Sequence, residues 1–154
     1  MAQLDRVLAS AQNTGMDGTT MAMDLSNKSG ATLRVSGLHW AVFLTLAQAY
    51  GWKPAGTNRP QHLPPTEEWS GRYDSNDGQT VADGDAKLLA QALHGAAVSK
   101  EINVALADVI RLIERQIEAA GTRIPDPMRM KPEDFHQGFS PLLLFLYQGE
   151  FVID

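Results

Sequence analysis

Apolar and polar positions alternate with a period of two in two short segments of the first third of the chain. In residues 20–25 the apolar Met23 and Leu25 lie two positions apart, and residues 31–35 alternate in the same way. The turn-forming residues 26–30 join the two segments. This pattern predicts an antiparallel hairpin in which one face is buried.

Helical spacing of apolar residues predicts most of the remaining regular structure. A short helix is expected over residues 4–11, where apolar positions recur every three or four residues. The segment 38–50 is apolar on nearly every side, so we expect it to be the central helix, covered by the other elements. Ser36 can cap the beginning of this helix, and Gly51 can end it.

Further helices are expected in the second half of the chain. Ser140 followed by Pro141 is a typical helix start. Ala82, at the beginning of an earlier helix, offers no side-chain acceptor for a cap. The expected elements are helices over residues 83–97, 101–120 and 142–147, and a final strand over 151–153. Asp83 and Asp85 lie in the first turn of the first of these helices, where the helix dipole favours acids.

Two stretches, residues 52–80 and 122–139, show no regular period and are interrupted by prolines, so irregular loops are expected there. The order of the elements predicts an α+β fold, in which a small antiparallel sheet (the hairpin plus the C-terminal strand) packs against four to five helices. The length of 154 residues fits one globular domain over 1–154.

Composition narrows the classes of function. Thirteen Lys and Arg against eighteen Asp and Glu give a net charge of −5, which is unlike a nucleic-acid-binding protein. Cysteine is absent, so disulfides and thiolate chemistry are excluded. The apolar run 142–147 is far shorter than a membrane span, and residues 1–6 do not resemble a signal peptide. We therefore expect a cytoplasmic protein without membrane contact, although export without a cleavable signal stays open.

Catalytic and metal motifs find little support in the sequence. The run from Asp74 to Gly78 resembles part of a calcium loop, but an EF-hand register would place Tyr73 and Gly84 at positions that need carboxylate ligands. The four histidines lack the spacing of a zinc helix, although the fold could still assemble a site from them. No serine elbow or phosphate loop occurs. No metal or cofactor is expected, and an enzyme is unsupported.

The loop over residues 52–80 contains the candidate binding residues. Its large aromatic side chains lie among polar and proline residues, where an exposed ring is a common partner anchor. Two interpretations remain open: the rings are partly exposed anchors with a polar rim, or they are buried and fix the loop to the domain. The candidate partner-binding residues are Trp52, Trp69, Tyr73, Asp74, Asn76, Asp77 and Gln79.

Several sequence blocks resemble a set of small stand-alone bacterial proteins of uncharacterised function. The blocks are Met23-Asp24-Leu25-Ser26, Leu44 to Trp52 (Leu-x-Leu-Ala-x-Ala-Tyr-Gly-Trp), Pro54-x-Gly56-Thr57, Tyr73-x-x-Asn76-Asp77-Gly78-Gln79-x-Val81 and Asp85-Ala86-x-x-Leu89-Ala90-x-Ala92-Leu93. The resemblance covers residues 16–97 and the closing Gly149-x-Phe151-x-Ile153.

In size and charge the chain is also similar to immunity proteins that neutralise bacterial toxins. This similarity implies a non-catalytic protein-interaction module, an immunity or antitoxin-like protein whose partner is another protein, such as a basic toxin steered to it by charge. The alternative is a small enzyme or ligand-binding protein with its site at the 73–79 turn. The oligomeric state is left open.

Overall fold

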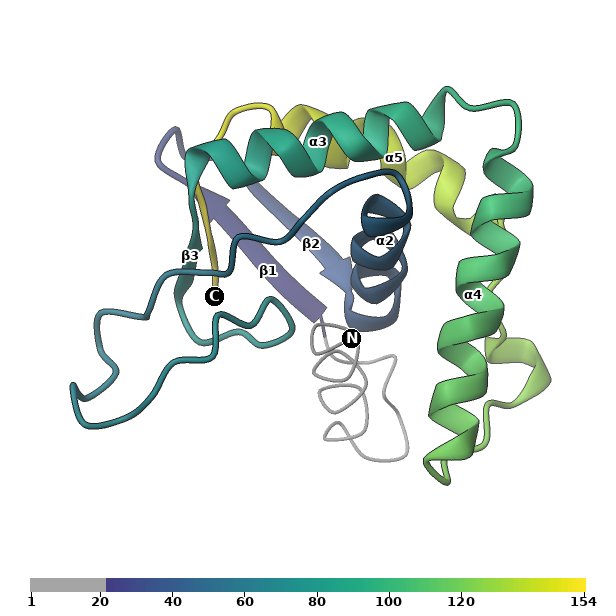
Figure 1. Cartoon of the computed structure of the whole chain (residues 1–154), viewed down its shortest axis with the longest axis horizontal. Helices are drawn as coiled ribbons and strands as arrows, with labels where there is room; N and C mark the ends of the chain where they lie inside the picture. Colours follow the sequence, from purple (N-terminus) through teal and green to yellow (C-terminus); the bar gives the residue numbers. More distant parts are fainter. Residues whose placement is uncertain (1–21) are drawn as a thin grey trace.

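A computed structural model describes residues 22–154 (Figure 1). Strands β1 (Ala22–Asn27) and β2 (Thr32–Ser36) form the predicted hairpin. They pair antiparallel, with Met23 opposite Val35, and the buried side chains of β1 all lie on one face of the sheet. The predicted helix over residues 4–11 lies outside the described residues.

Within residues 22–154 the sheet has four antiparallel strands, in the order β2-β1-β4-β3. Strand β4 (Phe151–Ile153) is the predicted C-terminal strand, and it pairs with both β1 and β3 (Gln79–Val81). The sequence did not predict β3. A strand of three residues that begins with a buried glutamine is too short and too polar to show a period of two, so its residues 79 and 80 fell within the expected loop.

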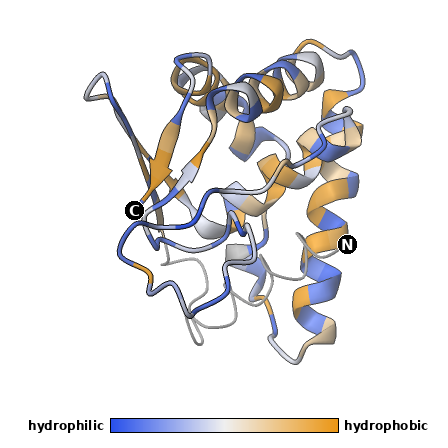
Figure 2. Ribbon diagram, turned by 60° about the vertical axis from the view of Figure 1, so that its left-hand side comes forward, coloured by the Kyte–Doolittle hydropathy of each residue, from blue (hydrophilic) through white to orange (hydrophobic). Residues whose placement is uncertain are grey.

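Four α-helices lie among the described residues, together with the short 3₁₀ helix η1 (Asp126–Met128). Helix α2 separates the sheet from α4, which is at the right of Figure 1, while α5 packs behind α3 at the top. Figure 2 shows that apolar residues are concentrated in the helices and strands. The helices are α2 (Gly37–Ala49), α3 (Asp83–Ala97), α4 (Ile102–Ala119) and α5 (Glu133–Leu146).

Helix α2 is the predicted central helix. Its side chains from Trp40 to Ala47 are all buried, because the sheet, α3 and α4 contact it from different sides. The Ser36 hydroxyl accepts a hydrogen bond of 3.1 Å from the His39 amide, which is the predicted N-cap. Gly51 has a φ of +100°, which a glycine adopts without steric cost, and the chain turns back after it. Ala82 is the N-cap residue of α3, as the sequence predicts.

Helix α5 corrects the sequence analysis. The irregular segment was expected to extend to residue 139 and the helix to begin at Ser140 and Pro141, but α5 begins at Glu133 and contains Pro141 in its interior. The helix continues because its apolar residues keep one face: Phe135, Phe139 and Leu142 are all buried. The free energy gained by burying this face exceeds the cost of the backbone hydrogen bond that Pro141 cannot donate.

We expect Pro141→Ala to raise the free energy of unfolding by about 1–2 kcal/mol, because it restores an amide that can donate within α5. Urea unfolding would measure the change. Ser140→Ala, at the exposed neighbouring position, serves as the control. If Pro141 were instead the first residue of a helix, its replacement would be neutral or destabilising, and that result would contradict the continuous α5.

Candidate functional site

The carboxylate of Asp85, in the first turn of α3, fixes the long loop that follows α2. Its Oδ1 accepts hydrogen bonds from the Trp52 indole Nε1 at 3.0 Å and from the Ala55 amide at 3.4 Å. Its Oδ2 accepts one from the Tyr73 hydroxyl at 2.5 Å. The Tyr73 oxygen in turn accepts a hydrogen bond from the Gly56 amide at 2.9 Å. The buried carboxylate is therefore satisfied by donors from three parts of the loop.

Two amide side chains fix the end of the same loop. The Asn76 side chain bonds the backbone of β1, accepting from the Asp24 amide at 3.1 Å and donating to the Ala22 carbonyl at 2.7 Å. The Asn76 side chain thereby satisfies backbone hydrogen-bonding groups of β1, as a neighbouring strand would. The buried Gln79 side chain donates to the Ser75 carbonyl at 2.6 Å and accepts from the Asp77 amide at 2.9 Å.

Two of the three aromatic rings are not exposed: for Trp52 and Tyr73 the interpretation as partly exposed anchors is wrong, and the alternative, that buried rings fix the loop to the domain, is confirmed. Both rings are buried and pack edge to face, with centroids 5.4 Å apart. Trp69 is half-buried, and its Nε1 donates to the Thr57 carbonyl and hydroxyl. Packing and hydrogen bonds to buried acceptors stabilise these rings inside the protein, although their neighbours in the sequence are polar.

The polar residues of the proposed rim also differ in exposure. Asp74 and Gln79 are buried, Asn76 is half-buried and Asp77 is exposed. The Arg72 Nε donates to Asp74 Oδ1 at 2.7 Å, while Asp74 Oδ2 has no hydrogen-bond partner among residues 22–154. Six of the seven candidate residues lie in the loop between α2 and β3, and Gln79 begins β3; most of the seven stabilise the loop. Partner binding by the accessible ones, Trp69, Asn76 and Asp77, stays a prediction.

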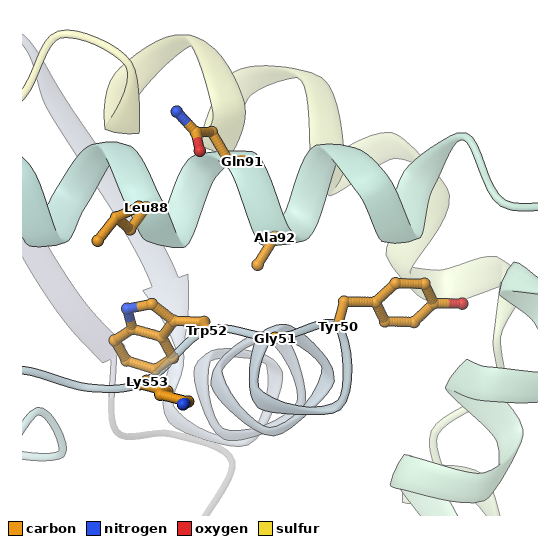
Figure 3. Close-up of a pocket in the computed structure, with 7 residues that line it drawn as sticks. All are labelled: Tyr50, Gly51, Trp52, Lys53, Leu88, Gln91 and Ala92. Carbon is orange, nitrogen blue, oxygen red and sulfur yellow. The ribbon is translucent and has the colours of Figure 1, made fainter.

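An open groove lies between α3 and the residues that follow α2 (Figure 3). Its volume is about 330 Å³. Leu88 and Ala92 project from α3 toward the Trp52 indole, and Leu88 is 56% exposed. The groove is lined by Tyr50, Gly51, Trp52, Lys53, Leu88, Gln91 and Ala92.

The groove has a fixed wall because Trp52 is held at both ends. Its amide donates to the Ala47 carbonyl at 2.9 Å, which closes the end of α2 around Gly51. Its indole is held by Asp85. Sequence analysis did not find the role of Asp85 or of Leu88: Asp85 was placed in the first turn of a helix, where the dipole favours an acid, and a single leucine beside a helical stripe gives no signal.

A second cleft, of about 320 Å³, lies beside the first turn of α2. Burial lowers the pKa of His39, although the Asp134 carboxylate partly opposes this. The His39 ring packs against Phe135 with centroids 4.4 Å apart. Arg129, also on the cleft, bonds Glu118. At pH 7 the His39 imidazole is therefore neutral, and it lies on the same cleft as the Asp134 carboxylate. The cleft is lined by Ser36, Leu38, His39, Pro127, Arg129, Met130 and Asp134.

Within residues 22–154, no group of three or more histidine, aspartate or glutamate side chains could hold a metal ion. No helix in the described part of the chain has the length and apolar character needed to cross a membrane. The chain matches no family model, no curated protein and no solved structure. The resemblances noted in the sequence therefore stay predictions.

The contacts of Tyr73 predict a loss of stability at alkaline pH. Burial, together with the hydrogen bond to Asp85, raises the pKa of the Tyr73 hydroxyl far above its ordinary value of about 10. The folded protein then keeps a proton that the unfolded chain releases above about pH 10. This stabilisation is complete below pH 10 and decreases as the pH rises, by at most ~1.4 kcal/mol per pH unit.

Tyr73→Phe should remove this dependence while lowering stability at pH 7 by about 1–3 kcal/mol, because Asp85 and the Gly56 amide lose a partner. Chemical unfolding at a series of pH values measures both effects. Tyr147→Phe, which removes an exposed hydroxyl, controls for the number of tyrosines and should keep the slope of the wild type. Equal slopes in the two variants would contradict the assignment.

Proposed function

We propose that this chain is a non-catalytic protein-binding module, an immunity or antitoxin-like protein that neutralises a basic bacterial protein. The observation that carries the proposal is the preformed apolar groove between Trp52 and α3, with the exposed Leu88 at its border. Apolar anchors that enter a rigid pocket dominate the energy of most protein interfaces, and a wall already fixed before binding lowers the entropic cost.

Two further features support this proposal. The net charge of −5 attracts a basic partner at long range, which raises the rate of association. The polar groups of the 73–79 turn bond the backbone and one another, with Asn76 on β1 and Gln79 on the turn itself. Groups engaged in this way stabilise the loop and are poorly placed for acid–base chemistry.

The partner to test is the protein encoded by the adjacent gene, purified and titrated calorimetrically with this chain. Leu88→Asp should weaken binding at least about tenfold, because it places a charge where the apolar anchor enters. Leu144→Asp is the matched control: Leu144 is 68% exposed on α5 and takes no part in the groove. It should bind within about twofold of the wild type.

Cells that express the adjacent gene should survive with the wild-type chain and with Leu144→Asp, and lose protection with Leu88→Asp. Circular dichroism would confirm that both variants fold. A neighbouring protein that does not bind, or equal binding by Leu88→Asp and the wild type, contradicts the proposal.

A second candidate is a small enzyme or ligand-binding protein. It is favoured by the cleft in which His39, with its lowered pKa, lies close to Asp134, rather than by the 73–79 turn. A neutral imidazole at pH 7 can act as a general base, and a neighbouring carboxylate can orient a substrate. For this candidate Asp134→Asn would abolish turnover or ligand binding, whereas Leu88→Asp would have no effect.

A further inference from the structure

We propose that the partner segment which docks in the groove carries a carboxylate beside its apolar anchor, and that this carboxylate pairs with Lys53. The inference rests on the proposed function and names the chemistry that the groove selects. It concerns the contacting segment only, whatever the charge of the rest of the partner.

The charge of the groove is opposite in sign to the net charge of the whole chain. None of its seven lining residues is acidic, and Lys53 is its one charged residue. Lys53 is exposed and forms no ion pair within residues 22–154. On α3 itself, by contrast, Lys87 is paired with Asp83 at 3.0 Å. A positive rim on an acidic protein favours a local negative charge in the partner.

The carboxylate that is bonded to the wall of the groove forms no ion pair with Lys53. Asp85 is buried, and its two oxygens accept hydrogen bonds from the Trp52 indole, the Ala55 amide and the Tyr73 hydroxyl. Among residues 22–154, therefore, no carboxylate pairs with the Lys53 ammonium, which can bind one from a partner.

The other two polar side chains of the lining, Tyr50 and Gln91, point away from the Trp52 ring and from Lys53, so Lys53 is the group that would bind the carboxylate. In Figure 3, the Trp52 ring and Leu88 form the apolar part of the groove, with Lys53 directly after Trp52. The anchor and the carboxylate should thus lie within one or two residues of each other in the partner.

The test uses two capped tetrapeptides, Glu-Leu-Phe-Glu and Lys-Leu-Phe-Lys, titrated into the ¹⁵N-labelled full chain and followed by NMR. The indole N–H of Trp52 reports on the groove. The indoles of Trp40 and Trp69, which donate to Tyr73 and Thr57, serve as internal references. At about 50 mM salt, where screening is weak, the acidic peptide should bind about fivefold tighter than the basic one.

Charge exchange at one position provides the decisive comparison. Lys53→Glu should reverse the preference, so that the basic peptide binds tighter. Leu88→Asp should weaken binding of both peptides, and Leu144→Asp should leave both affinities and the preference unchanged.

Equal affinities for the two peptides, a preference that survives Lys53→Glu, or no shift of the Trp52 indole with either peptide would each overturn the inference. These outcomes differ from a failure of the proposed function. If Leu88→Asp abolishes binding of the adjacent-gene product while the peptides show no preference, the proposed function stands and this inference fails.

Discussion

One buried carboxylate holds the loop, the central helix and the groove in their relative positions. Asp85 is favoured in the first turn of α3 by the helix dipole, and it accepts hydrogen bonds from Trp52, Ala55 and Tyr73. A buried charge is tolerated only where donors replace the water that it has lost. The loop supplies these donors. Asp85 can therefore be buried only if the loop follows this path, and the hydrogen bonds to Asp85 hold the loop in it.

The consequences extend across the molecule. Because Tyr73 is fixed, its carbonyl accepts a hydrogen bond of 2.8 Å from the Trp40 indole, which connects the loop to the buried side of α2. Because Trp52 is fixed, the groove against α3 has a rigid wall, and Lys53 follows that wall directly. The proposed binding residues are thus accessible side chains on a rigid support, an arrangement that keeps the cost of binding low.

The parts of the fold with a clear period were predictable from the sequence: the hairpin, α2, α3 and α4. Strands β3 and β4 each have three residues, too few for a period. β4 was predicted because all three of its residues are apolar, whereas β3 begins with two polar residues. At Pro141 a strong local signal was outweighed by the apolar face of α5. The site was less predictable. The contact between Trp52 and Asp85 joins residues 33 positions apart, and no spacing rule encodes it. The sequence could therefore identify Trp52 as important but could not decide between an exposed anchor and a buried ring that fixes the loop, and the second of these is what the structure has.

Hydrogen exchange in Asp85→Asn tests the central role of this carboxylate most directly, with Asp83→Asn, an exposed acid of the same turn, as the control. The asparagine has one acceptor oxygen for three donors, so the Trp52 indole and the Gly56 amide should exchange at least about tenfold faster, whereas amides in the middle of α4 should keep their protection. Unchanged protection of the Trp52 indole and the Gly56 amide in Asp85→Asn would contradict the account.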